Sequence, residues 1–344
     1  MLKASYGKYR LLFKRPSGTS RGILKSKDSW FLKVWEDENP DIVGIGECSI
    51  IYELSPDPMA HYKDKLDELV KSISNYQTFD LSAFPSIAFG LETALLDLRS
   101  GGKKVLFPSK FTKGIYSIPI NGLVWMGSYE FMRQQIVEKI ESGFNCIKLK
   151  IGAIDFEKEL ELLKMIRRDF SESDLELRVD ANGAFEPENA LEKLKRLSDF
   201  HIHSIEQPIT PNLWQEMALL CEQSPIDIAL DEELIGLKDS EIPDMLDKIN
   251  PKYIIIKPSL LGGLVRSEQI ISQAESLNIG WWATSALESN IGLNAIAQWC
   301  AVMSNTMPQG LGTGQLYSNN FDSPLFINKG HLHYRPDAEW KISY

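Results

Sequence analysis

The chain has 344 residues, with 37 Lys and Arg against 47 Asp and Glu, a net charge of -10 and 43% hydrophobic residues. These values exclude a disordered chain, and the acidic balance argues against a nucleic-acid partner. The longest apolar stretch, 253–265, is broken by Lys257 and Pro258, and the four cysteines are isolated, so we expect a cytoplasmic protein without a membrane partner.

The first part of the chain predicts a three-stranded antiparallel meander followed by two helices. Apolar and polar residues alternate, and turn residues separate the runs. The strands are predicted at 9–13, 30–35 and 42–50, with a loop at 15–22 and a turn at 39–41, and the helices at 58–76 and 85–100. We interpret residues 1–112 as an α+β capping domain, to which residues 320–344 return.

From about residue 115, short apolar strands alternate with helices. The predicted strands are 116–122, 145–151, 175–181, 202–207, 226–231, 252–258, 279–285 and 308–312. The helices between them are 128–142, 156–170, 187–198, 212–223, 239–249, 264–277 and 290–304. Strand–helix alternation indicates a parallel sheet, and eight strands indicate closure. The predicted fold of residues 113–319 is an α/β modified TIM barrel, (β/α)7β.

Polar side chains stand at the carboxyl ends of these strands, where the active sites of such barrels lie. They are Lys148 and Lys150, Asp180, Glu206, Asp231, Lys257 and Ser285. From Lys150 onward the steps between them are 30, 26, 25, 26 and 28 residues, which is one strand–helix unit each time. We therefore expect these side chains to meet at one mouth of the barrel, at the same height.

Three of these residues are carboxylates, Asp180, Glu206 and Asp231. Carboxylates crowded into a small cavity repel one another unless a cation or a proton intervenes. Oxygen ligands favour a hard ion. The spacing therefore predicts one Mg²⁺ per site, with Mn²⁺ as the alternative metal.

Lysines flank the carboxylates in strand order, with Lys148 and Lys150 before them and Lys257 after them. An ammonium group beside a divalent cation has a lowered pKa and can act as a base near neutral pH. Such bases, facing a carboxylate on a metal, suit removal of the proton from the adjacent carbon. This predicts a small anionic substrate and an enediolate intermediate.

These motifs together resemble those of the enolase superfamily, in its muconate-lactonizing subgroup. The segment 147–150 is similar to the Lys-x-Lys motif, and 179–182, 205–208 and 230–232 to the three metal-ligand motifs. Lys257 with Pro258, Ser259 and the following Gly-Gly is similar to the second-lysine motif. No His occurs between 203 and 331, which disfavours the mandelate-racemase-like dehydratases.

Within the subgroup the chain most resembles the o-succinylbenzoate synthase family, through Arg178, the segment 285–289 and Gly312-Thr313-Gly314. The resemblance implies dehydration of a hydroxy-succinyl-cyclohexadiene carboxylate in menaquinone biosynthesis. It implies that Lys150 removes the proton, Lys257 stabilises the anion and Lys148 holds the carboxylate. A loop at 18–22 would close over the site. The implied substrate contacts are Arg178, Asn182, Ser285, Glu288, Gly312 and Thr313.

Other readings stay open. An N-succinylamino acid racemase would use Lys150 and Lys257 as two opposed bases. Dipeptide epimerases share the lysines but carry Asp-x-Asp where 312–314 reads Gly-Thr-Gly. Muconate cycloisomerisation is a further alternative in the subgroup, and a catalytically idle barrel that acts as a binding protein is an alternative of another class. The sequence also leaves open whether the protein is a monomer or a homo-oligomer.

Overall fold

The structure is a computed structural model that describes residues 1–19 and 22–342. The chain begins with an antiparallel sheet in the order β1-β2-β3, which confirms the predicted meander. Its strands are β1 (Leu2–Thr19), β2 (Gly22–Glu36) and β3 (Asn39–Ser49). The strands are longer than predicted, and the turn lies at 37–38 rather than at 39–41.

The predicted loop at 15–22 is wrong for residues 15–19 and 22, because β1 and β2 continue through them. The β1–β2 register shifts between Leu12 and Ser17, so the extra residues around Pro16 are absorbed as an irregularity within a long hairpin. Residues 20 and 21 of that loop, and so part of the predicted closing segment 18–22, lie outside the described residues.

Helices cover one face of this sheet. They are the short 3-10 turns η1 (Met59–His61) and η2 (Ile73–Thr78) and the α-helices α1 (Tyr62–Lys71) and α2 (Pro85–Arg99). The approach of α2 to β3 requires glycine, because a Cβ on Gly46 would lie 1.9 Å from the carbonyl oxygen of Gly90. A buried cluster that includes Trp30, Leu32 and Leu66 fills the space between the sheet and the helices.

A seven-stranded parallel sheet follows, in the order β11-β10-β9-β8-β7-β6-β5. Its strands are β5 (Gly122–Val124), β6 (Cys146–Lys150), β7 (Glu176–Asp180), β8 (Ser204–Glu206), β9 (Asp227–Leu230), β10 (Tyr253–Ile256) and β11 (Gly280–Ala283). The connecting helices are α3 (Tyr129–Glu141), α4 (Phe156–Asp169), α5 (Pro187–Ser198), α6 (Trp214–Gln223), α7 (Ile242–Ile249), α8 (Pro258–Leu261), α9 (Leu264–Ser276) and α10 (Asn290–Met303). Short 3-10 turns occur at η3 (Glu232–Leu234) and η4 (Gly312–Gln315).

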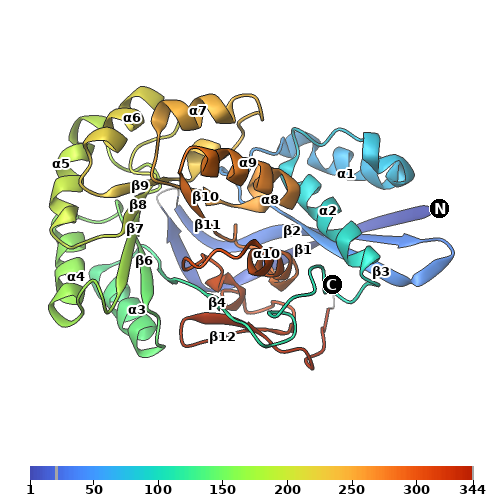
Figure 1. Cartoon of the computed structure of the whole chain (residues 1–344). Coiled ribbons are helices and arrows are strands. Elements are labelled where there is room, and N and C mark those ends of the chain that lie inside the picture. Colours follow the sequence, from blue (N-terminus) through green and yellow to red (C-terminus); the bar gives the residue numbers. More distant parts are fainter. Residues whose placement is uncertain (20–21, 343–344) are drawn as a thin grey trace.

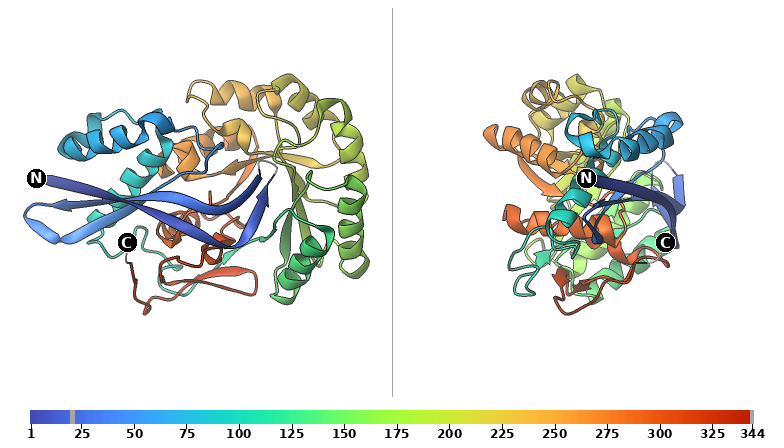
Figure 2. Two further views of the ribbon diagram at one scale, coloured as in Figure 1. Left: turned by 180° about the vertical axis from the view of Figure 1, so that it is seen from behind. Right: turned by 90° about the vertical axis from the view of Figure 1, so that its right-hand side faces the viewer.

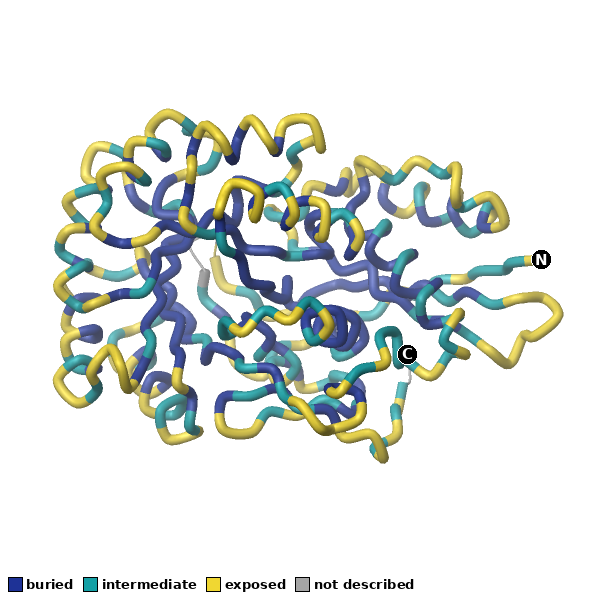
Figure 3. The backbone as a smooth tube through the Cα atoms, viewed as in Figure 1, coloured by how far each residue is buried: buried dark blue, intermediate teal, exposed yellow. Residues whose placement is uncertain are grey.

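The curled sheet lies inside a layer of helices, and the antiparallel sheet lies beside the barrel (Figures 1 and 2). Buried residues follow the strands, while the outward faces of the helices are exposed (Figure 3). The predicted α/β modified TIM barrel is therefore confirmed. No helix within the described ranges is long and apolar enough to cross a membrane.

Two predicted barrel strands differ in the structure. The stretch predicted as the first strand, 116–122, contains β4 (Ile118–Pro119), which pairs with β13 (His331–Tyr334) rather than with the barrel; β13 also pairs with β12 (Leu325–Asn328). The predicted eighth strand, 308–312, is reduced to single parallel bridges from Gln309 to Ile120 and from Gly310 to Thr284. Proline and glycine in both segments weaken a continuous ladder, yet these two bridges join the edges of the curled sheet.

The end of the chain contacts the N-terminal sheet. The backbone N–H of Lys14 donates to the carbonyl of Leu316, and Phe13 forms a bridge with Tyr317. Trp340 and Ile342 pack around a buried cluster that contains Phe31, Ile291 and Phe321. The limits drawn at 112/113 and 319/320 between a capping and a barrel domain stay a prediction.

Candidate active site

The strand-end charges converge at one mouth of the barrel. Lys150 is the register partner of Asp180, and Asp180 is the partner of Glu206. The partner of Glu206 on β9 is Ala229, so Asp231 lies two residues farther along. Tilted strands in a closed barrel require such a stagger in register, so it does not conflict with the expectation that these side chains lie at one level of the mouth, which stays a prediction.

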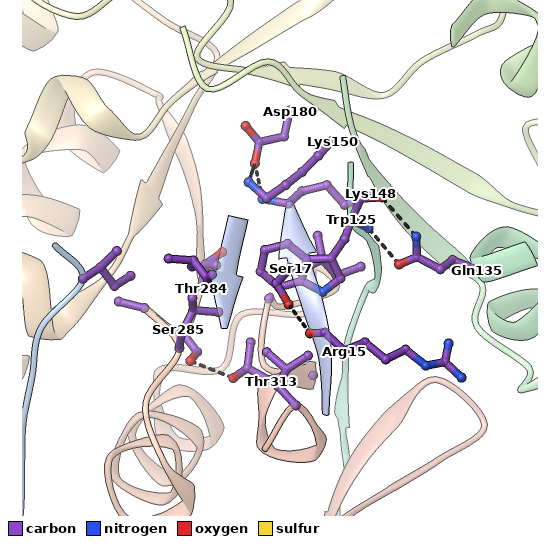
Figure 4. Close-up of a pocket in the computed structure, with 18 of the residues that line it drawn as sticks. Arg15, Ser17, Trp125, Gln135, Lys148, Lys150, Asp180, Thr284, Ser285 and Thr313 are labelled. Carbon is purple, nitrogen blue, oxygen red and sulfur yellow. Dashed lines mark hydrogen bonds and ion pairs between the residues drawn. The ribbon is translucent and has the colours of Figure 1, made fainter. Parts of the chain in front are cut away.

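Each of the three lysines contacts a carboxylate. The Nζ of Lys148 lies 3.0 Å from Asp180 Oδ2 and 2.7 Å from Glu206 Oε2. The Nζ of Lys150 lies 3.0 Å from the same Asp180 oxygen (Figure 4). Lys257 donates to Asp231 and lies 3.9 Å from Glu206 Oε1. The sequence prediction that these side chains gather in one place matches their arrangement.

Burial and opposite charge act against each other in this cluster. Burial acts to lower the pKa of Lys148, but the carboxylates of Asp180 and Glu206 outweigh it and raise that pKa above its ordinary value. The pKa of Lys257 is raised in the same way, by Asp231. Burial acts to raise the pKa of Asp180, but the neighbouring lysines hold it below its ordinary value. The lowered lysine pKa that we expect beside a bound cation stays a prediction.

The three carboxylates also suit a divalent cation. Within residues 1–19 and 22–342, no group of three His, Cys, Asp or Glu side chains is already arranged to hold an ion. Ammonium groups lie against the carboxylates instead, and they leave Glu206 Oε1 and Asp231 Oδ1 buried without a hydrogen-bond donor from the described chain. Two such oxygens beside Asp180 form the hard-oxygen set that Mg²⁺ prefers, so the residues fit the metal.

One residue just beyond β7 and one just beyond β8 adopt unusual backbone conformations. Asn182 has a φ of 46° and Gln207 a φ of 41°, and both lie in the left-handed region that non-glycine residues seldom occupy. The Nζ of Lys150 donates to Asn182 Oδ1 at 2.6 Å, and Asn182 Nδ2 donates to Glu232. Gln207 Oε1 accepts from the backbone N–H of Asp231 at 3.2 Å. These bonds orient Lys150 and Asp231.

A cavity of about 610 Å³ opens above the charge cluster. Lys148, Lys150 and Lys257 line it on the barrel side, and the β1–β2 hairpin lines it on the other. Trp125 forms part of the wall, and the centre of its ring lies 5.9 Å from the Nζ of Lys150. Gln135 holds the backbone of Trp125 with two hydrogen bonds (Figure 4). The cavity therefore has room for a small organic molecule.

Four of the residues predicted to contact substrate line this cavity, namely Ser285, Thr313, Gly312 and Asn182. Their contact with substrate stays a prediction. The Thr313 hydroxyl donates to Ser285 Oγ at 2.7 Å (Figure 4). Glu288 does not line the cavity: it accepts from Ser285 and from Ser259, at 2.5 Å each, and it is fully buried. The predicted direct contact of Glu288 with substrate is therefore corrected to a role in orienting Ser285. Burial raises the pKa of Glu288.

Arg178 also lies away from the cavity. Alternation correctly directs it into the barrel, but it lies one pleat below Asp180. Its Nε donates to Glu176 Oε1 at 2.7 Å, and its guanidinium carbon lies 4.2 Å from the centre of the Trp282 ring. These partners hold the guanidinium beneath the cavity, while its Nη2 is buried without a hydrogen-bond partner among the described residues. The predicted substrate contact of Arg178 stays a prediction.

A buried carboxylate joins the N-terminal sheet to the barrel. Glu47 on β3 accepts from the backbone N–H groups of Ser289 and Gly292, each at 3.0 Å, and from the Ser289 hydroxyl at 2.6 Å. These groups lie at the start of α10, where N–H groups lack helical partners. On the sheet, Ser29 donates to Glu47 at 2.7 Å, and the ammonium of Lys27 lies 4.0 Å away. The hairpin is thereby held over the barrel mouth.

Several cavity residues escaped the sequence analysis. Lys14 and Arg15 come from β1 and Lys139 from α3, and all three line the cavity. No motif or strand-end position marks them, because a basic residue on a hairpin or a helix is normally solvated. Gln207, which orients Asp231, is a further functional residue to which the sequence analysis gave no role. Its position directly after Glu206 is the signal that could have found it.

Comparisons with known proteins agree with this geometry. The family model described as Enolase C-terminal domain-like matches residues 132–338. An o-succinylbenzoate synthase of Desulfotalea psychrophila is 49% identical, covering 96% of this chain and 98% of the relative. The crystal structure of MenC from Desulfotalea psychrophila LSv54 is similar with a TM-score of 0.87 at 46% identity, covering 96% of this chain and 99% of that one. A hydrophobic dipeptide epimerase of Enterococcus faecalis is 26% identical, with 83% of this chain and 82% of the relative covered.

Proposed function

Since the chain is an enzyme that belongs to the Enolase C-terminal domain-like family, we propose that it dehydrates a cyclohexadiene carboxylate bearing a hydroxyl group and a succinyl chain to o-succinylbenzoate. The observation that carries this proposal is the pairing of Lys150 with Asp180 and Asn182 at the floor of the cavity. The relative with 49% identity supports the choice of substrate.

Asp180, Glu206 and Asp231 would hold one Mg²⁺, with Mn²⁺ as a substitute. When bound there, the metal supplies a positive charge that stabilises negative charge developing on the substrate carboxylate. The buried oxygens Glu206 Oε1 and Asp231 Oδ1, which lack donors from the described chain, support this assignment.

The protein's own residues move the proton. Lys150 removes the hydrogen from the carbon next to the ring carboxylate, which leaves an enediolate. The same ammonium then protonates the departing hydroxyl group, and loss of water makes the ring aromatic. Lys257 also lines the cavity and would stabilise the anion by charge, while Lys148 holds the carboxylate side of the site in place. Trp125 and the hairpin exclude water from the ring.

A second candidate is racemisation of an N-succinylamino acid. It is favoured by one observation, the presence of both Lys150 and Lys257 in the lining of a single cavity. Racemisation needs two bases on opposite faces of one carbon, whereas dehydration needs one. The two activities use the same lysines, so a single site can support both.

The experiment that tests the proposal is a direct assay. The purified protein is mixed with the hydroxy-succinyl-cyclohexadiene carboxylate, with and without Mg²⁺, and aromatisation is followed by absorbance. Rapid turnover that requires Mg²⁺ is expected. If no turnover occurs while Mg²⁺ binds, the dehydratase proposal is wrong, and exchange of the α-hydrogen of N-succinylamino acids in D2O tests the second candidate.

A further inference from the structure

The cavity has two lysines that the proposed chemistry does not use. Six cationic side chains line it: Lys14, Arg15, Lys139, Lys148, Lys150 and Lys257. Lys148, Lys150 and Lys257 pair with strand-end carboxylates, and Arg15 lies 3.3 Å from Glu138. Within the part of the chain that the structure describes, Lys14 and Lys139 have no ion pair. Glu53 and Glu138 also line the cavity, and Glu138 acts on Lys139 at longer range, but neither carboxylate lies within ion-pair distance of Lys14 or Lys139. These two ammonium groups can therefore each accept an anion as a direct partner.

Lys139 is built into the cavity wall. A Cβ on Gly122 would lie 3.0 to 3.2 Å from the Cδ, Cγ and Cβ atoms of Lys139, so the absence of a side chain at Gly122 leaves room for the lysine stem to cross β5. The Nζ lies 5.1 Å from the centre of the Phe144 ring. The side chain is half-buried, and burial lowers the pKa of Lys139. A half-buried ammonium group without an ion-pair partner is stabilised when an anion binds beside it, because the anion replaces the solvation that burial removes.

Lys14 reaches the same cavity from the N-terminal sheet. Its backbone N–H donates to the carbonyl of Leu316 at 2.8 Å, which fixes this part of β1 against the segment after η4. Lys14 and Lys139 thus come from two separate elements, and both line the cavity. An anion between them would be held by the hairpin and by the barrel at once.

The proposed substrate has two carboxylates, one on the ring and one at the end of the succinyl chain. The ring carboxylate belongs beside Lys150 and the Mg²⁺ that the three acidic side chains would hold. We propose that Lys139, assisted by Lys14, binds the second carboxylate and so selects dicarboxylates over monocarboxylates. This inference rests on the proposed function and extends it to the specificity of the same site.

The test compares two probes in the presence of Mg²⁺ by titration calorimetry. One probe is o-succinylbenzoate, and the other is its analogue with the chain carboxylate replaced by a carboxamide. Lys139→Met keeps the length of the stem and removes the charge. It is expected to weaken binding of o-succinylbenzoate about tenfold and to leave binding of the carboxamide unchanged, because one charge-assisted contact is lost.

The matched control is Arg133→Met, on the exposed face of the same helix, which is expected to change neither affinity. Thermal unfolding checks that the variants fold. Should Lys139→Met fail to fold, Lys14→Met tests the same carboxylate from an exposed position, with an expected loss of about threefold. Equal binding of o-succinylbenzoate by the wild type and the folded lysine variant would overturn the inference.

The outcomes separate this inference from the proposed function. If the protein dehydrates the substrate but Lys139→Met binds o-succinylbenzoate as tightly as the wild type does, the inference is refuted and the proposed dehydratase activity stands. Charge-dependent binding of o-succinylbenzoate without any dehydration would refute the dehydratase and keep the dicarboxylate site. If the wild type binds neither probe, the inference is refuted.

Discussion

The two sides of the cavity are built in different ways. On the barrel side, β6 to β10 form continuous parallel ladders, and the lysines and carboxylates stand at or just beyond their ends. On the facing side, the wall is made of the β1–β2 hairpin, α3 and residues 309–316, where the ladders are interrupted. Regular strands thus position the charges, while irregular segments, held by tertiary contacts, decide which molecule can reach them.

The largest expected loss of activity comes from a mutation on the barrel side of the cavity. Lys150→Ala removes the proposed base and should lower kcat by about a hundredfold to ten-thousandfold, since a general base contributes a factor of that order. Steady-state absorbance assays measure the loss. Lys158→Ala, on an exposed position of α4, is the control and should keep full activity. Retained turnover in a folded Lys150→Ala protein would remove Lys150 from the mechanism.

Removing the metal should abolish the chemistry on the barrel side of the cavity without any mutation. Chelation by EDTA is expected to lower turnover about a hundredfold or more, since a metal contributes several kcal/mol to charge stabilisation. Added Mg²⁺ or Mn²⁺ should restore the rate. Asp231→Asn should weaken Mg²⁺ binding measured by calorimetry. Undiminished activity in excess EDTA would show that the carboxylates serve another purpose.

Glu47 joins the two sides, so its removal tests whether they depend on each other. Glu47→Ala leaves the buried N–H groups of Ser289 and Gly292 without an acceptor and should lower the free energy of unfolding by about 3 kcal/mol. Urea unfolding measures the change, with the exposed Glu36→Ala as control. Wild-type stability of Glu47→Ala would mean that the sheet and the barrel are held together elsewhere.

A smaller effect concerns the loop after β6. Glu159 on α4 accepts from the backbone N–H of Gly152 at 2.7 Å, and burial raises the pKa of Glu159 to about 7. The folded protein therefore keeps a proton that the unfolded chain releases near pH 4.5, so stability falls as pH rises from about 4.5 to about 7 and then levels.

Glu159→Gln removes this titration while it keeps an acceptor for Gly152. Its stability relative to wild type should increase on the order of 2 kcal/mol between pH 5 and pH 8. Thermal unfolding across this range measures the difference, and Glu161→Gln, exposed on the same helix, should show no such trend. A pH-independent difference for Glu159→Gln would contradict the assignment.

The smallest expected change in stability comes from an exposed ion pair on the side of the cavity that faces the barrel. The side chain of Arg15 is 60% exposed, and it pairs with Glu138, which is 40% exposed, at 3.3 Å. Solvent screens such a pair, so Arg15→Ala should change the free energy of unfolding by less than about 0.5 kcal/mol. A loss of several kcal/mol in chemical denaturation would show that the hairpin depends on this contact.

The fold could be predicted as far as local pattern determines it. The strands from β6 to β11 and the helices that follow them lie within a few residues of their predicted ranges, because buried parallel strands and amphipathic helices have distinct periods. Pro119 and Gly310 mark the two predicted barrel strands that differ in the structure. The segment of Pro119 pairs instead with β13, and only single bridges from residues 309 and 310 complete the barrel there, because tertiary contacts that no local period reports decide these pairings.

The site divides in the same way. The spacing of Lys150, Asp180 and Glu206, one strand–helix unit at each step, predicted their convergence. The resemblance to the enolase superfamily is confirmed by the comparisons. Alternation put Arg178 on the inner face but could not say that Trp282 and Glu176 engage it one pleat below the cavity. The depth of a side chain depends on its neighbours on other strands, which the sequence alone does not show.

The claim that the barrel side performs the chemistry while the facing side selects the substrate is tested most directly by the kinetics of two single variants on one substrate. Lys150→Ala and Lys139→Met are assayed in parallel with the hydroxy-succinyl-cyclohexadiene carboxylate at saturating Mg²⁺. Lys150→Ala is expected to lose kcat while it still binds o-succinylbenzoate, and Lys139→Met is expected to raise KM with kcat almost unchanged. Loss of kcat in the Lys139 variant, or unchanged kcat in the Lys150 variant, would contradict the claim.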